Sequence, residues 1–301
     1  MPELPEVESV RRGLLDLTAG RQVTDVTVLH PRLLRDQPGG PPEFADRLRG
    51  GLLGTPRRRG KFLWLPVVDR TDQRLGVAQE ADPSQALVVH LGMSGQVRVV
   101  VAAAPMHPHT RVVAALDDGY EIRFVDQRMF GRLRMDELVP GADELPRSVS
   151  HIARDPLDPR FHARVLVDRL RLRRTVLKRA LLDQTLVSGI GNIYADESLW
   201  RARLHGERPT FGLPVRTGNR LLAHIHDVLN EAISAGGTSF DALYVNVNGE
   251  SGWYERDLAV YGREGLACRR CGTPVRRSVF TNRSSFTCPS CQRLSVNRLT
   301  A

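Results

Sequence analysis

Apolar residues in the first 135 positions fall into short runs typical of β-strands. These runs are rich in valine and bounded by glycine, proline or aspartate, and they span residues 22–29, 61–68, 86–91, 96–103, 110–116 and 120–125. Ahead of them, Leu4, Val7, Val10 and Leu14 recur at the spacing of one helix face. Because strand follows strand without intervening helices, the pattern predicts a largely antiparallel β-sandwich with flanking helices.

The second half of the chain has a helical pattern. A linker is predicted over residues 136–159, which contain four prolines. Helical periodicity follows at about 160–171, 175–187, 192–204 and 214–235, and the glycine-containing stretch 236–262 predicts a long loop. The predicted organisation is therefore an N-terminal domain over 1–135, the linker, a helical domain over 160–262 and a cysteine-bearing module over 263–301.

Composition narrows the class of protein. The chain has 301 residues, of which 41% are hydrophobic and 26% charged, as in globular proteins. No apolar run approaches the roughly 18 residues of a membrane span, and the acidic N-terminus lacks the apolar segment of a secretory signal. The four cysteines all follow position 267, which excludes a disulfide framework through the chain. We therefore expect a cytoplasmic protein with no membrane partner.

Positive charge is concentrated in the second half. Residues 1–150 hold 20 basic and 20 acidic side chains, whereas residues 151–301 hold 23 and 14 and so carry the whole formal net charge of +9. This imbalance favours a polyanionic partner; a solvated surface in an arginine-rich chain is the alternative. Only two of the 43 basic residues are lysines, Lys61 and Lys178, and an amine can act as a nucleophile or proton carrier where arginine cannot.

The cysteine spacing is the most specific motif. Two Cys-x2-Cys pairs are separated by 16 residues, and their members are Cys268, Cys271, Cys288 and Cys291. This spacing supplies four thiolates to one tetrahedral zinc ion. Because four thiolates leave no open coordination position, we expect one structural Zn²⁺ per chain. Arginines between the pairs, such as Arg283, suit phosphate contacts, so the motif indicates a zinc-stabilised nucleic-acid contact.

A glycine turn joins two of the predicted helices. In Ser188-Gly189-Ile190-Gly191-Asn192 the glycines let the backbone approach a ligand closely, and the amides that open the next helix favour an anion. An ordinary helix–helix turn with Asn192 as N-cap is the alternative.

The second residue suits covalent chemistry. Removal of Met1 would leave Pro2 with a free secondary amine, and an α-amino pKa of roughly 8 keeps part of it neutral at pH 7. Attack of this amine on an aldehyde-level carbon gives a cationic iminium, which is an electron sink for β-elimination. Glu3 and Glu6 are close enough in sequence to move protons. A preference for proline at a helix start is the alternative.

Together these motifs resemble the formamidopyrimidine-DNA glycosylase family. The resemblance extends over essentially the whole chain and includes Met-Pro-Glu-Leu-Pro-Glu-Val-Glu at the start, Gly60-Lys61, residues 90–95 and 126–131, the glycine turn, Tyr261-Gly262-Arg263 and the four-cysteine finger. It implies an N-terminal β-sandwich, a helix-two-turn-helix domain and a zinc finger. It also implies a monomeric, bifunctional base-excision repair enzyme that binds damaged double-stranded DNA. Such an enzyme removes oxidised purines, notably 8-oxoguanine opposite cytosine and formamidopyrimidines, and cleaves the strand by β,δ-elimination.

The resemblance implies roles for individual residues. Pro2 matches the Schiff-base nucleophile, Glu3 the adjacent acid/base and Glu6 a supporting carboxylate. Lys61 matches a lysine assigned to proton transfer and phosphate contact, and Arg283 an arginine that assists δ-elimination. The expected DNA contacts are Met93, His107, Arg128, Phe130, Arg173, Lys178 and Asn192. Of these, Met93, Arg128 and Phe130 match the residues that fill the space left by a flipped nucleotide.

Several features leave alternatives open. His107-Pro108-His109 departs from the usual His-Asp-His of the family, so either histidine is a candidate DNA contact. The stretch 69–84 is longer than usual, and 236–256 corresponds to a loop that closes over the flipped base. An endonuclease VIII-like glycosylase for oxidised pyrimidines would share Pro2, Glu3 and the finger. A non-catalytic damage-binding protein is a further alternative, and a zinc-ribbon RNA-binding module would explain only the last 40 or so residues.

Overall fold

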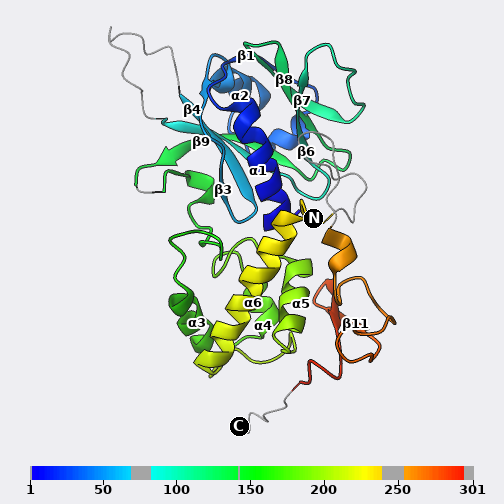
Figure 1. The fold of residues 1–301 in the computed structure, drawn as a ribbon. Coiled ribbons are helices and arrows are strands. Elements are labelled where there is room, and N and C mark those ends of the chain that lie inside the picture. The colour runs from blue at the N-terminus through cyan, green and yellow to red at the C-terminus, as the bar shows by residue number, and fades with distance from the viewer. Residues whose placement is uncertain (1, 69–82, 142, 239–253, 295–301) are drawn as a thin grey trace. The chain divides into compact units, whose positions relative to one another are not determined.

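A computed structural model describes residues 2–68, 83–141, 143–238 and 254–294. The chain forms two compact units, Met1–His151 with Ala235–Trp253 and Ile152–Ser234 with Tyr254–Ala301, and Figure 1 shows their elements. The division after His151 falls inside the predicted linker 136–159, while the other predicted domain bounds stay predictions. The predicted loops 69–84 and 236–256 lie largely outside the described residues.

The first unit contains two antiparallel sheets (Figure 1). One has the order β1 (Val23–Val28), β7 (Thr110–Leu116), β8 (Tyr120–Val125) and β6 (Gln96–Val101). The other has the order β10 (Leu145–Pro146), β9 (Arg132–Val139), β5 (Gln85–His90), β4 (Phe62–Val68) and β2 (Leu52–Leu53), with β3 (Arg57–Arg59) also paired to β4. All these strand pairs are antiparallel, which confirms the predicted β architecture.

Side chains from both sheets and from helix α1 (Leu4–Thr18) share one apolar core cluster. Val10 and Leu14 of α1 are fully buried in it, as the predicted helix face requires. Strand β5 is buried along Ala86–Val89, which explains why its sequence is a continuous apolar run rather than an alternating one. This packing fixes the helix that begins two residues after Pro2.

Several elements of this unit were not predicted, namely strands β2, β3, β9 and β10, helix α2 and two short 3-10 helices. Strand β9 extends into the region expected to be a linker, although buried Leu133 and Met135 alternate with more polar neighbours as a strand pattern requires. Helix α2 (Gly40–Leu48) has prolines at its second and third positions, which a first helical turn tolerates because its N–H groups have no helical acceptor. Short 3-10 helices lie at η1 (Pro31–Leu34) and η2 (Arg147–Val149).

The second unit is helical and ends in a hairpin. Its elements are α3 (Ala163–Leu172), α4 (Leu177–Leu182), α5 (Asn192–Arg201), α6 (Val215–Ser234), η3 (Tyr254–Asp257), β11 (Arg276–Phe280) and β12 (Arg283–Thr287). The predicted helical region and the cysteine-bearing finger are confirmed. Helix α4 is shorter than expected because Asp183 accepts hydrogen bonds from Thr185 at its end. Within the described ranges, no helix has the length and apolar character needed to span a membrane.

Candidate functional site

The start of α1 places two carboxylates beside Pro2. Glu3 is the N-cap residue, and its backbone N–H donates to Glu6 Oε2 at 2.8 Å in a capping box. Glu3 is 3% exposed and Glu6 2%, and Pro2 is also buried. Three of the residues expected to perform the covalent step therefore lie together.

Glu6 is held from a second direction by residue 238. Its Oε1 accepts hydrogen bonds from the backbone N–H of Thr238 at 2.8 Å and from the Thr238 hydroxyl at 3.0 Å. Gly237 has a φ of +85°, and a Cβ there would lie 3.0 Å from Glu6 Oε1, so glycine permits the close approach. The sequence did not reveal Thr238, because 232 residues separate it from Glu6. Both carboxylate oxygens of Glu6 therefore accept hydrogen bonds, and Glu6 positions the N-terminal end of α1.

Lys61 lies in the turn between β3 and β4, and that turn is tied to α1. Gly60 has a φ of +57°, which the turn requires. Arg58 donates to the Gly60 carbonyl at 3.1 Å and to Glu8 Oε2 on α1 at 3.0 Å. Although burial raises the pKa of Glu8, contacts with Arg11 and Arg58 dominate and lower it to about 2. Lys61 itself is only 7% exposed, so its amine is not a solvated surface charge.

Two turns present the three residues expected to replace a flipped nucleotide. Met93 is 39% exposed, Phe130 is 46% exposed, and Arg128 is exposed as well. Between them, fully buried Asp126 accepts hydrogen bonds from Ser94 Oγ at 2.5 Å and from the Gly131 N–H at 2.7 Å. The buried Asp126 carboxylate therefore joins the two turns and fixes the backbone that carries Met93, Arg128 and Phe130.

The same turns meet closely through their backbones. A Cβ on Gly92 would lie 2.4 Å from the Phe130 carbonyl carbon, so this position excludes any other residue without a shift. Arg35 donates to the carbonyls of Gly131 at 2.9 Å and Phe130 at 3.1 Å. The sequence motifs include both turns, but they did not identify Ser94, Asp126 and Arg35 as the residues that support them.

The two candidate histidines lie side by side. His107 Nδ1 accepts the backbone N–H of His109 at 3.1 Å, and Arg111 Nη2 lies 3.1 Å from His109 Nδ1. Burial, and then the positive charge of Arg98, lower the pKa of His107. A neutral His107 that accepts at Nδ1 keeps Nε2–H as a donor. Both rings are partly exposed, so the choice between the two histidines stays open.

In the second unit, two predicted DNA contacts converge on the finger hairpin. Asn192 Nδ2 donates to the Ser284 carbonyl at 2.9 Å, and Lys178 Nζ lies 3.3 Å from the same oxygen. Asn192 is the first helical residue of α5, and Gly191 occupies the N-cap position. Arg283 precedes the shared carbonyl. The helix-two-turn-helix turn and the hairpin therefore bring Asn192, Lys178 and Arg283 together.

Lys178 lies beneath the surface and not on it. Its side chain is 0% exposed, and Nζ pairs with Asp196 Oδ1 at 2.7 Å. Asp196 also accepts hydrogen bonds from Ser285 Oγ at 3.2 Å and from the Phe286 N–H at 2.9 Å. Burial raises the pKa of Asp196 to about 6 against the opposing attraction of Lys178. A direct contact of Lys178 with DNA stays a prediction, and the ion pair shows that this lysine supports the hairpin.

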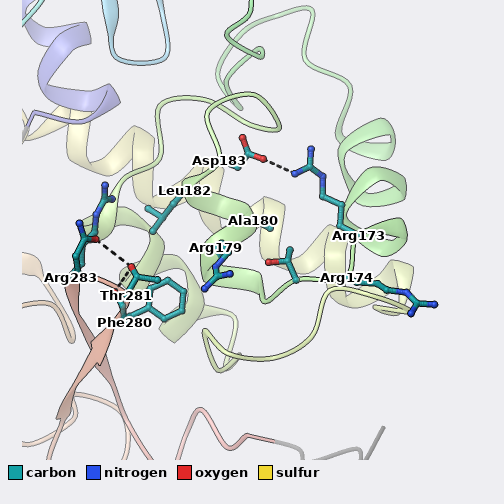
Figure 2. Close-up of a pocket in the computed structure, with 11 residues that line it drawn as sticks. Arg173, Arg174, Arg179, Ala180, Leu182, Asp183, Phe280, Thr281 and Arg283 are labelled. Atoms are coloured by element: carbon teal, nitrogen blue, oxygen red, sulfur yellow. Dashed lines mark hydrogen bonds and ion pairs between the residues drawn. The ribbon is translucent and has the colours of Figure 1, made fainter. Parts of the chain in front are cut away.

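Glu197, the residue after Asp196 in α5, binds the segment that leads into the finger. Buried Glu197 accepts three backbone N–H groups, those of Ala259, Val260 and Tyr261, each at 2.9 Å. Sequence reasoning missed Asp196 and Glu197, since the glycine turn before them drew attention to Asn192. The remaining predicted contact, Arg173, lines a pocket with Arg283 that is shown in Figure 2.

The four cysteines are arranged to bind a metal ion. Their sulfur atoms all lie within 4.8 Å of one another, and a tetrahedron with Zn–S bonds of about 2.3 Å has S···S edges of about 3.8 Å. The all-sulfur donor set fits zinc. The Trp200 indole N–H on α5 donates to Cys268 Sγ at 3.3 Å, and the Arg270 guanidinium lies 4.0 Å from the centre of the Trp200 ring. The site is thus joined to the helix that carries Asp196 and Glu197.

Comparison with known proteins identifies the family. Three family models match: the formamidopyrimidine-DNA glycosylase N-terminal domain over residues 1–133, the H2TH domain of the same enzymes over 152–243, and a zinc finger found in FPG and IleRS over 265–294. A formamidopyrimidine-DNA glycosylase of Salinispora tropica is 57% identical over 293 residues, with 97% of this chain and 96% of the relative covered. The chain belongs to the formamidopyrimidine-DNA glycosylase family. One from Streptomyces coelicolor is 55% identical, with 97% and 98% covered.

Solved structures of formamidopyrimidine-DNA glycosylases share the fold. The MutM (FPG) protein of Thermus thermophilus aligns with a TM-score of 0.79 at 35% identity, covering 97% of this chain and 99% of that one. A Lactococcus lactis Fpg bound to DNA with an abasic site aligns with a TM-score of 0.80 at 28% identity, with the same coverage. Another complex of the Lactococcus lactis Fpg contains DNA with an oxidised pyrimidine. Family membership and the predicted three-part fold are therefore confirmed.

Proposed function

We propose that this protein is a bifunctional DNA glycosylase and abasic-site lyase of base-excision repair. Its proposed substrates are oxidised purines in duplex DNA, namely 8-oxoguanine opposite cytosine and formamidopyrimidines, and it would act as a cytoplasmic monomer. The observation that carries this proposal is the buried cluster of Pro2, Glu3 and Glu6, with Glu6 fixed by Thr238. Family membership supports the reaction class.

The reaction we propose begins with the neutral amine of Pro2. Its lone pair attacks C1′ of the damaged nucleotide, the C1′–N bond to the base breaks, and the base leaves with that electron pair and a proton. The Pro2 nitrogen then loses its proton, the C1′–O4′ bond breaks with its electron pair and a proton going to O4′, and the nitrogen lone pair forms an iminium with C1′. Loss of a C2′ proton then breaks the C3′–O bond, and loss of the C4′ proton breaks the C5′–O bond, so that each phosphate leaves with the electron pair of its C–O bond. Glu3 is proposed as the carboxylate that moves these protons.

Access to C1′ requires the nucleotide to leave the duplex, at a cost of a few kcal/mol. Met93 and Phe130 are exposed apolar side chains on turns that Asp126 holds rigid. We propose that they enter the vacated stack, as apolar wedges do in kinked DNA. Arg128, on the same turn as Phe130, is proposed to hydrogen-bond the orphaned cytosine.

The remaining candidate residues are proposed to hold the DNA backbone. Arg283, Asn192, Arg173, Lys61 and His107 are offered as phosphate contacts, with Arg283 and Lys61 also assisting elimination. The cysteines would hold one zinc ion, which supplies no reaction chemistry and fixes the arginine-bearing hairpin. Lys178 is proposed to act through its ion pair with Asp196, which also accepts the Phe286 N–H of that hairpin.

Borohydride trapping tests the proposal directly. Protein whose intact mass shows loss of Met1 is incubated with an 8-oxoguanine:cytosine duplex, and hydride reduces any iminium to a stable amine. We expect an adduct that maps to Pro2, and a much lower adduct yield with Pro2→Gly, which replaces the secondary amine with a primary one. Glu3→Gln should slow excision by about 10²–10⁴-fold, the usual contribution of a general acid or base, while duplex affinity stays within twofold.

The same assay separates the alternatives. An adduct formed only with thymine glycol would replace the proposal with an oxidised-pyrimidine enzyme, a lesion class present in one Lactococcus lactis Fpg complex. Intact duplex binding without trapping or strand cleavage would indicate a damage-binding protein instead. Trapping at a lysine with Pro2→Gly unaffected would remove Pro2 from the mechanism.

A further inference from the structure

Arg58 joins the turn that carries Lys61 to the helix that follows Pro2. Its Nη1 donates to the Gly60 carbonyl at 3.1 Å, and its Nε donates to Glu8 Oε2 at 3.0 Å. Glu8 belongs to α1, and Gly60 immediately precedes Lys61. The side chains of Arg58 and Glu8 are each at most 10% exposed. One largely buried guanidinium therefore contacts the helix and the turn at the same time.

The turn itself has little conformational freedom. Arg59 of β3 pairs with Phe62 of β4, so only Gly60 and Lys61 lie between the paired residues. Gly60 has a φ of +57°, and a positive φ at the first of two turn positions is the feature of a II′ hairpin turn. This register places Lys61 at the tip of the hairpin. The place of that tip in the unit is then set by the contacts that hold the hairpin against its neighbours.

Helix α1 holds the hairpin at a second point as well. The Arg11 Nη1 donates to the carbonyl of Pro56, just before β3, at 3.4 Å. Arg11 also donates to both oxygens of Glu8, at 2.8 and 3.0 Å. The helix and β3 lie side by side in Figure 1. Contacts from α1 thus reach both ends of β3, at Pro56 and, through Arg58, at Gly60.

The register of the hairpin explains why Arg58, and neither of its neighbours, contacts the helix. Arg58 pairs with Leu63, which is buried in the core cluster that α1 shares. Directly paired residues project from the same face of a sheet, and the next residues along each strand project from the other. Arg57 and Arg59 therefore project from the opposite face, where they pair with acidic residues that follow β9. Of the three arginines of β3, only Arg58 faces the helix.

The Glu8 carboxylate is a lasting partner for this guanidinium. With a pKa of about 2 it is ionised throughout the neutral range. It also pairs with Arg11 and with Arg12, whose Nε lies 3.0 Å from Oε1. Arg12 is exposed, and it approaches the oxygen that Arg58 does not use. Arg12 therefore offers a control: its removal changes the surroundings of Glu8 without a change in the contact to the turn.

We propose that Arg58 and Glu8 are positioning residues for Lys61, which hold the hairpin tip at a fixed place relative to the Pro2 end of α1. The inference rests on the proposed function, in which Lys61 contacts phosphate and assists elimination, and it adds two largely buried residues that act through this amine. A reacting group works from a narrow range of positions, and a misplacement of about 1 Å can slow a reaction by about 100-fold. The bridge therefore matters to the step that Lys61 performs.

The first test observes Lys61 without any reaction. Because the chain has only two lysines, Lys61 and Lys178, protein made with lysine labelled at Cε gives two lysine Cε signals in NMR spectra, and K61R identifies the first by its absence. R58A and E8Q should each shift the Lys61 signal and the pH at which it titrates. The signal of buried Lys178 belongs to the other unit and should stay in place. R12A should leave both signals unchanged.

The second test asks whether Arg58 acts through Lys61 in the reaction. Single-turnover excision of 8-oxoguanine and cleavage of a preformed abasic site are measured for R58A, K61A and the double variant. R58A should slow the same step as K61A, by about 10- to 100-fold, and the double variant should be no slower than K61A alone. Independent effects would instead multiply, to within about twofold. R58K keeps the charge but supplies one donor atom in place of two, so it should be impaired nearly as much as R58A.

Circular dichroism of the same samples checks the fold. E8Q breaks the bridge from the helix side, so its own cycle with K61A gives the same decision if R58A does not fold.

Each outcome bears on the bridge. An unmoved Lys61 signal in both R58A and E8Q would overturn the proposal, as would rate losses of R58A and K61A that multiply in the double variant. Wild-type rates in R58K would also overturn it, because a single charged donor would then suffice. If the wild type neither traps nor excises, the proposed function fails, while the Lys61 signal still decides whether Arg58 and Glu8 position that amine.

Discussion

Both compact units bury carboxylates, yet they use them differently. In the first unit Glu3 and Glu6 lie at the start of α1 beside Pro2, where a reacting group is expected. In the second unit Asp196 and Glu197 accept bonds from Lys178 and from backbone N–H groups of the finger and its approach. The first unit thus keeps Glu3 and Glu6 next to the proposed nucleophile, whereas the second uses Asp196 and Glu197 to hold the hairpin and the segment that leads to it. Substitutions should therefore impair chemistry in one unit and binding or stability in the other.

Removal of the metal is the strongest way to test this division. In small zinc domains metal binding contributes about 10–16 kcal/mol to folding, so chelation should unfold the finger and abolish duplex binding. The sheets of the first unit have their own core and should remain. Duplex affinity is followed by anisotropy and the sheets by circular dichroism on the same sample.

Retained duplex binding by metal-free protein would break the comparison, because binding would then not depend on the finger. Simultaneous loss of the β-sheet signal would break it differently, by showing that the first unit depends on the finger for its fold.

The buried ion pair of the second unit gives the next largest effect. Asp196→Ala leaves the Lys178 ammonium buried without its partner, which typically costs about 3–5 kcal/mol. The matched control is Glu231→Ala, because Glu231 pairs with Arg201 while half exposed, and such pairs contribute about 1 kcal/mol or less. Unfolding of the second unit is followed in guanidinium through Trp200 in a background with the other tryptophans replaced. Equal losses in the two variants would mean that Asp196 does not hold the hairpin.

The sequence reveals repeated and local features of this fold well. Valine-rich runs locate the strands of the sandwich, and the cysteine spacing locates a finger that the family comparison confirms. The residues proposed for the covalent step are also close in sequence, since Pro2, Glu3 and Glu6 lie at the start of one helix. The sequence does not reveal contacts between residues that are far apart in the chain. Thr238 binds Glu6 across 232 residues, and no periodicity or motif connects the two.

Burial of charge is likewise invisible in the sequence. Lys178 follows an apolar residue in a basic segment and resembles a surface contact, yet its ammonium is enclosed by Asp196 and the Ser284 carbonyl. Strand β9 was missed for a related reason: its arginines and acids lie beside a proline-rich stretch, and only pairing with β5 shows that Leu133 and Met135 enter the core. In each case the partner that decides the structure is remote in sequence.

Acid titration gives a smaller effect, confined to the first unit. Glu8 has a folded-state pKa of about 2 against an ordinary value of 4.5, so its contribution is present above pH 4.5 and is lost as the pH falls toward 2. This lowering corresponds to about 3 kcal/mol at most, and solvent screening at the partly exposed partner Arg11 reduces it to about 1–2 kcal/mol. Glu8→Gln should be less stable than the wild type by that amount at pH 7.

The difference between wild type and Glu8→Gln should shrink as the pH falls from 4.5 to 2, as measured by urea unfolding of the first unit. A difference that stays constant across this range would mean that Glu8 acts through packing and not through its pairs with Arg11 and Arg58.

The smallest expected effect concerns the joint between α5 and the cysteines. Trp200→Phe preserves an aromatic ring against Arg270 but removes the N–H that donates to Cys268 Sγ. Loss of a hydrogen bond to a metal ligand typically lowers metal affinity about tenfold or somewhat more, so zinc should pass to a competing chelator about tenfold more readily. Trp64→Phe is the matched control, because buried Trp64 Nε1 has no hydrogen-bond partner among the described residues. If both variants retain zinc equally, the hydrogen bond from Trp200 does not contribute to metal affinity, and α5 supports the finger through Asp196 and Glu197 alone.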